Sequence, residues 1–314
     1  MLAPLVAWLR RQRIPFTEDA PIAPHLYFRI GGTVSLLVAP ASVPERLAVL
    51  QELAVLGLPC LVIGGGSNIA FADGPTRAVV VLAQTQLPAG DPMPLADGGS
   101  FQVDAGMRNQ AFLSWCAAHG AGGLEFLSGI PGTLGGAAVV NAGAFGRSMS
   151  DVLLGADIVD GQGSVRPVDA GDFGFQYRDS RFKMGRETLL ALRLRFSHDD
   201  GNAIAKKIKV NLEYRLKRHP PYRLASAGCF FKNPVQAGVK TSAGKLIEEC
   251  GLKNTMQGDL EVAGEHANFL VNHGRGTFAD LQLLEEKIRA AVSVRSGVVL
   301  EREVIYVSPD GEKY

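Results

Sequence analysis

Cysteine is scarce in this sequence, and the cysteines it contains stand apart from one another. The 314 residues include four of them, Cys60, Cys116, Cys229 and Cys250, and no two form a C-x-x-C pair. Disulfide frameworks and structural zinc sites need closely placed cysteines, so neither is expected, and no metal site is predicted. This pattern is typical of a reducing compartment, and we expect a cytoplasmic protein.

An excess of charge of one sign is also missing. Lys and Arg number 32, Asp and Glu number 31, and no segment is a dense Lys/Arg run. Non-specific binding to nucleic acid depends on such a basic face, so no nucleic-acid partner is expected. A net charge near zero and the lack of an obvious exposed apolar stripe favour a monomer.

Long apolar runs are absent as well. No stretch of about 18 uncharged apolar residues occurs, so no membrane span is expected. The N-terminal "MLAPLVAWLRRQRIPF" has its arginines after the apolar part, the reverse of a secretory signal, and predicts a short amphipathic helix. With 46% apolar and 20% charged residues, the chain has the composition of a soluble protein with a core, long enough for two or three domains.

Glycine, in contrast, is abundant, and 37 residues fall largely into two bunches. In "VIGGGSN" (62–68) an apolar strand leads into three glycines, whose backbone N–H groups could form a nest for a pyrophosphate; a tight strand connection is the alternative. The spacing matches neither the Rossmann nor the P-loop motif. The second bunch, "SGIPGTLGGAAVVNAGAFG" (128–146), is both apolar and glycine-rich, which suggests backbone wrapped around a large flat ligand. Two such segments favour an extended dinucleotide over packing alone.

The remaining pattern predicts an α+β protein. Short β-branched runs alternate with helical patterns at 42–57 and 109–120, both of which finish at glycine, and residues 277–297 predict a further amphipathic helix. Thr277 or Asp280 could cap that helix. A polar turn, a charged helix and a Pro-Pro stop over residues 197–222 indicate a domain boundary.

Eight motifs, taken in order, carry a family resemblance. They are "FRIGG" (28–32), "VIGGGSNIAFADG" (62–74), "GLEFLSGIPGTLGGAAVVNAGAFG" (123–146), "YRDSRFK" (177–183), "SAGCFFKNP" (226–234), "AGKLIEECGLK" (243–253), "HANFLVN" (266–272) and "LEREV" (300–304). Together they resemble the UDP-N-acetylenolpyruvoylglucosamine reductase family of peptidoglycan precursor synthesis. Only about 50 residues separate Arg178 from Cys229, which resembles the shorter subgroup that lacks the tyrosine-loop insertion.

The resemblance implies a fold and a division of the chain. The family has a two-part FAD-binding body of the vanillyl-alcohol-oxidase/PCMH type and a C-terminal α+β substrate-binding domain. We therefore expect a first FAD-binding part over residues 1–86, a second over 87–200 and a substrate-binding domain over 201–299. Residues 300–314, with "LEREV" as a final strand, are expected to return to the first part.

The resemblance also implies how FAD is held. The predicted cofactor-binding residues are Arg29, Gly64, Gly65, Gly66, Ser67, Asn68, Gly129, Ile130, Pro131, Gly132, Thr133, Gly136 and Asn141. Covalent attachment in this superfamily uses His or Cys in the flavin-binding body. The candidates there lie outside the glycine-rich loops, so non-covalent FAD is expected; these candidates are His25, Cys60, Cys116 and His119.

The implied reaction is the reduction of UDP-N-acetylglucosamine enolpyruvate to UDP-N-acetylmuramate, with NADPH as reductant. Reduced flavin passes hydride to the enolpyruvyl alkene, and the resulting enolate is protonated. Three residues match the family's catalytic positions: Arg178 and Glu303 would stabilise the enolate, and Cys229 would donate the proton. On the residues alone, the alternatives are an ion pair of Arg178 with the adjoining aspartate, a solvated Glu303 and a core-packing Cys229.

Further positions follow from the same resemblance. The predicted substrate contacts are Tyr177, Lys232 and Asn233, which flank the catalytic positions. Serine is the family's commonest residue at position 229, and "EVAGEHANF" (261–269) departs from the usual Ser and Lys, which leaves a substrate contact or a capped turn open for His266. Two rival functions also stay open, namely another FAD-dependent oxidoreductase of this superfamily and a non-catalytic flavin- or nucleotide-sugar-binding homologue.

Overall fold

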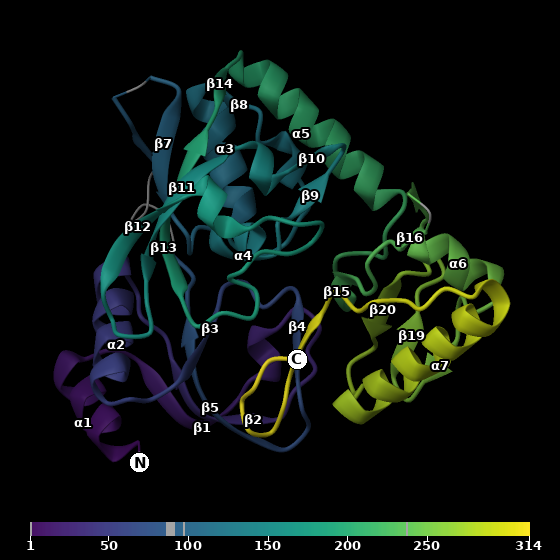
Figure 1. The fold of residues 1–314 in the computed structure, drawn as a ribbon, viewed down its shortest axis with the longest axis horizontal. Coiled ribbons are helices and arrows are strands. Elements are labelled where there is room, and N and C mark those ends of the chain that lie inside the picture. Colours follow the sequence, from purple (N-terminus) through teal and green to yellow (C-terminus); the bar gives the residue numbers. More distant parts are fainter. Residues whose placement is uncertain (1, 86–91, 97, 237) are drawn as a thin grey trace. The chain divides into compact units, whose positions relative to one another are not determined.

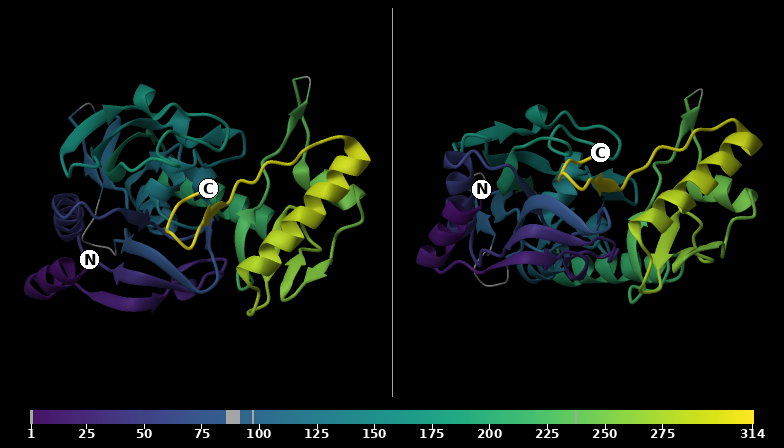
Figure 2. Two further views of the ribbon diagram at one scale, coloured as in Figure 1. Left: turned by 60° about the horizontal axis from the view of Figure 1, so that its bottom comes forward. Right: turned by 90° about the horizontal axis from the view of Figure 1, so that it is seen from below.

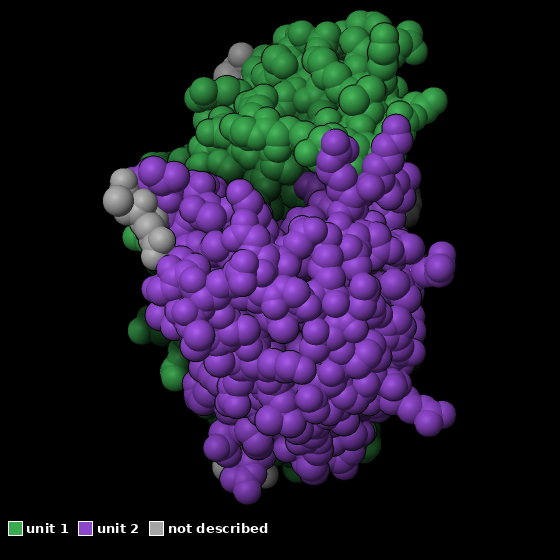
Figure 3. Space-filling view, turned by 90° about the vertical axis from the view of Figure 1, so that its right-hand side faces the viewer, with its two compact units in different colours: residues 1–18, 36–65, 78–214 green, residues 19–35, 66–77, 215–314 purple. Residues whose placement is uncertain are grey.

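The computed structural model describes residues 2–85, 92–96, 98–236 and 238–314 (Figure 1). The chain forms two compact units, which Figure 3 distinguishes by colour. Unit 1 comprises residues 1–18, 36–65 and 78–214, and unit 2 comprises residues 19–35, 66–77 and 215–314. Each unit therefore assembles segments that lie far apart in the sequence.

An antiparallel sheet of strand order β12-β11-β13-β7-β6 is the frame of unit 1 (Figure 1). Its strands are β6 (Met93–Pro94), β7 (Ser100–Asp104), β11 (Leu153–Val159), β12 (Val165–Asp169) and β13 (Thr188–Arg195). Helices α3 (Asn109–His119) and α4 (Leu134–Val139) share one core with this sheet, in which Phe101, Phe112 and Leu134 are fully buried. The predicted end of α3 at glycine is confirmed, because Gly120 takes the left-handed conformation that closes the helix.

A second sheet has the order β1-β2-β5-β3, and its strands β3 and β5 are parallel. The strands are β1 (Phe16–Pro21), β2 (Thr33–Val38), β3 (Cys60–Ile63) and β5 (Pro75–Leu82). Helices α1 (Ala3–Gln12) and α2 (Val43–Val55) bury Leu9 and Val49 in a core that they share with this sheet. The amphipathic helix predicted at the N-terminus is thus confirmed as α1, and Ser42 caps α2 by accepting the Glu45 N–H.

Shorter elements complete unit 1. They are β8 (Ala121–Gly122), β9 (Gly143–Ala144), β10 (Arg147–Ser148), β14 (Ser197–His198) and most of helix α5 (Gly201–Leu216), whose last two residues belong to unit 2. Strands β9 and β10 form a hairpin, and α5 is the charged helix expected after residue 197. Across the described residues, no helix combines the length and apolar character that crossing a membrane requires.

Unit 2 is built on an antiparallel sheet of order β15-β20-β19-β18, with α7 packed against β18 and β19 (Figure 2). Its elements are β15 (Ala225–Cys229), β16 (Val235–Gln236), β17 (Val239–Lys240), α6 (Ala243–Glu249), β18 (Met256–Gln257), β19 (Leu260–Val262), β20 (Phe269–Asn272) and α7 (Phe278–Ser296). Both predicted capping residues of α7 are used, since Thr277 is the N-cap and Asp280 completes a capping box.

The end of the chain differs from the expected final strand over "LEREV". The strand β21 (Ile305–Val307) begins later, and it pairs in parallel with β4 (Ile69–Phe71). The residues before it form an isolated antiparallel bridge between Phe231 and Arg302 instead of a ladder, with one bond from the Glu303 N–H to the Phe230 carbonyl at 2.8 Å. The shift places Glu303 in a connection ahead of the strand.

The expected division into 1–86, 87–200 and 201–299 stays a prediction. Its first boundary lies outside the described residues, and its second falls at the start of α5. Residues 19–35 and 66–77 group with unit 2 because Phe28, Ile30 and Ala70 are buried in the same core as α7. Burial of these apolar side chains, more than strand pattern, decides the grouping.

Candidate active site

The two glycine-rich bunches meet in unit 1 with no room for side chains between them. A Cβ added to Gly65 would overlap the backbone of Gly132, and one added to Gly64 would overlap the Thr133 hydroxyl. Glycine at both positions is therefore required by the close approach of two backbones. The result is a cradle, defined here as residues 64–65 and 129–133, whose polar groups are largely those of the main chain.

Side chains that the sequence analysis did not single out hold this cradle in shape. Asn109, 1% exposed at the start of α3, donates from its backbone N–H to Gly132 O and from Nδ2 to Ile130 O, both at 3.1 Å. Gln84 donates to Gly64 O at 2.9 Å and accepts from Arg108 at 2.9 Å. In the sequence, a polar residue at the first position of the predicted helix over 109–120 was the signal that could have identified Asn109.

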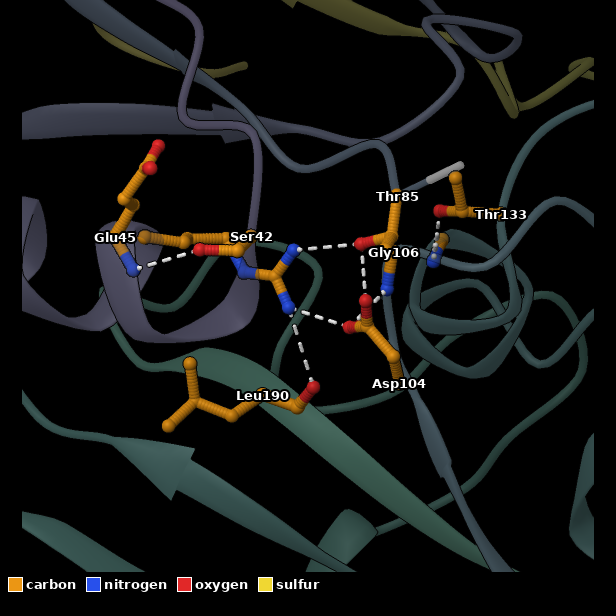
Figure 4. Close-up of polar contacts among 9 residues, drawn as sticks. Ser42, Glu45, Thr85, Asp104, Gly106, Thr133 and Leu190 are labelled. Atoms are coloured by element: carbon orange, nitrogen blue, oxygen red, sulfur yellow. Dashed lines mark hydrogen bonds and ion pairs between the residues drawn. The ribbon is translucent and has the colours of Figure 1, made fainter. Parts of the chain in front are cut away.

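Behind the cradle, Arg46 of α2 and Asp104 at the end of β7 form a buried ion pair at 2.5 Å (Figure 4). Arg46 is 2% exposed, and Asp104 also accepts from the Thr85 hydroxyl and, at 2.8 Å, from the Gly106 N–H. A buried charge without its partner is strongly destabilising, so both partners must be in place.

This ion pair is linked to the second glycine-rich segment through residues 105–107. The Ala105 carbonyl accepts from Gly135 N at 2.7 Å, and the Met107 carbonyl accepts from Leu134 N at 2.9 Å. The side chain of Thr133 caps α4 by accepting the Gly136 N–H at 3.3 Å (Figure 4). The predicted residues Thr133 and Gly136 thus lie on an element that the buried ion pair supports.

Arg178 lies in a tight turn of unit 1 whose ends are Gln176 and Asp179. These two residues exchange backbone hydrogen bonds, and Arg178 takes a left-handed φ of 57° between them. The Arg178 guanidinium donates to the carbonyl of Asn141 at 3.2 Å and to that of Gly143 at 2.5 Å. The predicted substrate contact Tyr177 shares the turn and is exposed, with its ring 5.5 Å from the guanidinium carbon.

The side chain of Asn141, predicted to bind the cofactor, makes contacts with protein backbone. Its Nδ2 donates to Gln176 O at 2.9 Å, and its Oδ1 accepts from Ser150 N at 3.1 Å. Together with its carbonyl bond to Arg178, these contacts tie Asn141 to both the turn and the guanidinium. The arrangement fits a residue that positions Arg178.

An open pocket of about 450 Å³ lies beside the hairpin that accepts the Arg178 bond. It is lined by Phe145 and Arg147 of the β9–β10 hairpin and by Lys206 and Lys207 of α5, among others. No residue of the predicted site lines this pocket. One of its lining residues, Phe145, lies two positions after Gly143.

Unit 2 brings together three of the recognised motifs. The Phe230 carbonyl, next to Cys229, accepts from Glu303 N at 2.8 Å, and Asn68 Nδ2 donates to the Glu303 carbonyl at 3.3 Å. Asn68 also accepts from Ile305 N at 3.0 Å through its own carbonyl. The predicted proton donor, the predicted catalytic carboxylate and the end of the "GGGSN" loop therefore belong to one local structure.

Cys116 and Cys229 differ in burial. Cys116 is fully buried in the core of unit 1, and burial raises the pKa of its thiol far above the usual range. Cys229, at the end of β15, is half-buried and pairs across the sheet with Phe269. Cys229 also packs against the apolar cluster of Ala263, Phe269 and Val271, so its role as proton donor stays a prediction.

The chain around Glu303 is anchored to α7. Arg302 donates to Glu285 at 3.2 Å, and the Tyr306 hydroxyl donates to the same carboxylate at 2.7 Å. Burial raises the pKa of Tyr306 well above its usual value, which keeps the hydroxyl a donor. Through Arg302 and Tyr306, these bonds hold the chain on both sides of the Glu303–Val304 segment.

The predicted substrate contacts Lys232 and Asn233 have defined partners. Lys232, with a side chain 14% exposed, donates to Glu301 at 2.6 Å, and its backbone N–H donates to the Glu301 carbonyl at 2.8 Å. Asn233 Oδ1 accepts from Ala243 N at 2.9 Å at the start of α6. Both residues thus fasten the segment after Cys229 to its surroundings.

The remaining predicted cofactor residues of unit 2 lie in two adjoining loops. Gly66 accepts from Tyr27 N at 3.0 Å, and a Cβ added to Gly66 would overlap the His25 carbonyl. Arg29, two residues beyond Tyr27, is exposed, and Ser67 is half-buried. The loop after residue 65 and the "FRIGG" loop are thereby brought together.

His266 forms part of a turn and of an aromatic cluster. Its Nδ1 accepts from Asn268 N at 3.2 Å, and its ring lies 5.0 Å from Phe269 and 5.6 Å from His219. Burial is the main cause that lowers the pKa of His266 and lowers that of His219 to about 4. Both imidazoles are therefore neutral at neutral pH. His266 contacts the backbone of its own turn, and a contact with the substrate stays a prediction.

Comparison with known proteins identifies the family of the chain. Residues 34–169 match the family described as FAD binding domain, and residues 220–307 match UDP-N-acetylenolpyruvoylglucosamine reductase, C-terminal domain. The chain is 38% identical to UDP-N-acetylenolpyruvoylglucosamine reductase of Geobacter metallireducens, over 98% of this chain and 99% of that one. It is 34% identical to the reductase of Moorella thermoacetica, over 93% of each chain.

A solved structure shows the same fold. The crystal structure of UDP-N-acetylenolpyruvylglucosamine reductase from Thermus caldophilus superposes with a TM-score of 0.73 at 27% identity, over 94% of this chain and 98% of that one. The expected fold class, an FAD-binding body with a C-terminal α+β domain, is therefore confirmed. On the identity and coverage of these relatives, the chain belongs to the UDP-N-acetylenolpyruvoylglucosamine reductase family.

Proposed function

We propose that this protein reduces UDP-N-acetylglucosamine enolpyruvate to UDP-N-acetylmuramate, with FAD as cofactor and NADPH as reductant. The full-length similarity to named reductases supports the reaction. Within the structure, the observation that supports the proposal is the bond between Glu303 N and Phe230 O, since it links Glu303 to the residue next to Cys229. Glu303 and Cys229 are both expected to act on the substrate. The monomeric state and cytoplasmic location expected from the sequence stay predictions.

The backbone cradle of residues 64–65 and 129–133 fits FAD. Its glycines keep side chains out of the contact between the two loops. Main-chain N–H groups of glycine-rich loops can bind phosphate oxygens. Gly66, Ser67, Asn68 and Arg29 would extend the contact. Bound FAD would take electrons from NADPH and pass them to the carbon–carbon double bond of the substrate.

Gly65→Ala is expected to weaken FAD binding by about 10- to 100-fold, because the new methyl group overlaps the Gly132 backbone and forces the loops apart. The measurement is titration of apoprotein with FAD, followed by flavin fluorescence. Gly161→Ala is the matched control, since a Cβ there meets no atom within 4 Å. Wild-type affinity in Gly65→Ala would show that the cradle does not hold the cofactor.

Arg178 would stabilise the negative charge that develops on the substrate as electrons arrive. Its guanidinium is planar and always charged, and its five N–H donors can serve two backbone carbonyls and a carboxylate. The bonds to Asn141 and Gly143 fix its orientation. A pre-oriented cation acts without having to reorganise during the reaction.

Cys229 would supply the proton that completes the reduction, and Glu303 would act on the same centre. A thiol is a stronger acid than the serine hydroxyl common in the family at this position, so it can donate a proton to the enolate carbon that hydride transfer leaves. The backbone bond between Phe230 and Glu303 keeps the two side chains in one local structure. Tyr177, Lys232 and Asn233 would contact the substrate.

The test is direct. The purified protein is expected to be yellow and to release FAD on denaturation. In the presence of NADPH and without oxygen, it is expected to convert the enolpyruvyl substrate into a product that is heavier than the substrate by two hydrogen atoms. Colourless protein that cannot be reconstituted with FAD would overturn the cofactor assignment. FAD-loaded protein that is reduced by NADPH but not reoxidised by this substrate would instead indicate one of the rival oxidoreductase or binding functions.

A further inference from the structure

A buried asparagine, Asn268, stands immediately before strand β20 in unit 2. Only 2% of it is exposed, although an amide side chain carries two donors and acceptor sites that need partners. It lies in the turn that connects β19 to β20, within the "HANFLVN" motif.

Both amide functions of Asn268 are used on the backbone of one residue, Phe231. Oδ1 accepts from Phe231 N at 2.9 Å, and Nδ2 donates to Phe231 O at 2.8 Å. The backbone carbonyl of Asn268 accepts in addition from Phe230 N at 2.7 Å. Three hydrogen bonds therefore clamp the two residues that directly follow Cys229.

This clamp stands where the regular strand ladder is interrupted. The pairing of β15 with β20 shifts register between Ser226 and Cys229, and Gly228 takes a left-handed φ of 78°. An irregular strand end does not by itself specify where its last side chain points. The bonds to Asn268 hold the backbone of Phe230 and Phe231, which directly follow Cys229.

The other side of the same segment is bound to the backbone of Glu303, the residue with the predicted catalytic carboxylate. The Phe230 N–H is held by Asn268 and the Phe230 carbonyl by Glu303 N, at 2.7 and 2.8 Å. Asn268 is itself held, because its N–H donates to His266 Nδ1 at 3.2 Å. A continuous chain of bonds thus runs from His266 through Asn268 and Phe230 to Glu303.

We propose that Asn268 is a positioning residue for proton transfer: its clamp on Phe230 and Phe231 sets the Cys229 thiol at the distance from the substrate that protonation requires. The inference rests on the proposed function. Asn268 contacts neither substrate nor FAD in this role and acts only through the backbone. Displacement of a reacting group by about 1 Å can lower a rate about 100-fold, so the clamp has a kinetic consequence.

Asn268→Asp tests the proposal with nearly the same side-chain volume. An aspartate has acceptors where Nδ2 donated to Phe231 O, so one bond is lost and two oxygens face each other. We expect reduction of FAD by NADPH to keep its wild-type rate, and reoxidation by the enolpyruvyl substrate to slow about 10- to 100-fold. The solvent deuterium isotope effect on reoxidation should rise, because proton transfer becomes slower.

A matched control is Asn272→Asp at the other end of β20. Asn272 is 3% exposed, and its side chain bonds to the backbone of Phe28, Arg29, Gly274 and Gly276 but not to residues 229–231. This variant loses comparable buried bonds and is expected to melt at a lower temperature, with the reoxidation rate of its FAD-loaded form unchanged. Equal slowing in both variants would show that Asn268 acts through stability alone.

A double-mutant cycle separates this inference from the proposed function. Because Asn268 acts through Cys229, Asn268→Asp combined with Cys229→Ala is expected to be no slower than Cys229→Ala alone. Additive slowing would overturn the positioning role. If the wild-type protein itself does not turn over the substrate, the proposed function fails instead, and that result is distinct.

A measurement without turnover covers the case in which Asn268→Asp fails to fold. In the wild-type protein, the Phe231 N–H is expected to be strongly protected from hydrogen exchange. In a second experiment, iodoacetamide is expected to alkylate Cys229 faster in Asn268→Ser than in the wild type. Mass spectrometry follows the modification at each cysteine. Rapid exchange at Phe231 in the wild type would refute the clamp. An unchanged alkylation rate in Asn268→Ser would refute its effect on the thiol.

Discussion

Cys229→Ala is expected to leave reduction of the flavin by NADPH at the wild-type rate and to slow its reoxidation by the enolpyruvyl substrate by about 10²- to 10⁴-fold. That range is the usual contribution of a positioned general acid. Cys229 lies at the end of β15, and its neighbour Phe230 is bonded to the backbone of Glu303, so removing the thiol removes the donor without altering the backbone contacts. Anaerobic stopped-flow on pre-reduced protein separates the two half-reactions.

The control for this variant is Cys250→Ala. Cys250 is also a half-buried cysteine of unit 2, at the end of α6, and has no place in the proposed site. Its removal is expected to leave both half-reactions unchanged. If Cys229→Ala were reoxidised as fast as wild type, Cys229 would be a packing residue and the proton would come from another group.

Cys229→Ser tests whether a hydroxyl group can replace the thiol as proton donor. The hydroxyl is smaller and a weaker acid, but it forms stronger hydrogen bonds. Fast reoxidation would mean that thiol and hydroxyl are interchangeable donors. Slow reoxidation with normal reduction would mean that the surroundings of Cys229 are adapted to the thiol.

Arg178→Lys is expected to lower the rate of substrate reduction by about 10²- to 10³-fold, the usual cost of losing one pre-oriented donor to a developing anion. The guanidinium donates to the Asn141 and Gly143 carbonyls at the same time, and an ammonium group cannot reproduce that planar arrangement. The effect should fall on kcat for the enolpyruvyl substrate and on the reoxidation half-reaction, because charge develops there. Steady-state and single-turnover rates measure it.

Arg181→Lys is a suitable comparison for Arg178→Lys. Arg181 is three residues further along, is exposed, and bonds to Glu187 and to the Asp172 carbonyl outside the turn. Its replacement is expected to change turnover by less than a factor of about two, as for most exposed ion pairs. Near-normal turnover in Arg178→Lys would refute the charge-stabilising role of Arg178.

Local sequence patterns were sufficient to predict much of the secondary structure, and local motifs were sufficient to identify the family. The helices at 43–55, 109–119 and 278–296 were predicted from apolar spacing, caps and terminal glycines, which are properties of neighbouring residues. The motifs placed the glycine-rich loops and the candidate catalytic positions Arg178, Cys229 and Glu303. Motifs identify such positions because the chemistry requires particular residue types there.

The residues that hold the site were decided only by tertiary structure. Asn268 lies 37 positions from Phe231, and Asp104 lies 58 positions from Arg46. The late start of β21 and the grouping of residues 19–35 with unit 2 also depend on distant partners. The sequence by itself therefore determined the local elements and the family, since both follow from residue type and spacing. The folded chain decided which buried polar groups pair, because each such bond joins segments whose separation along the chain carries no periodic signal.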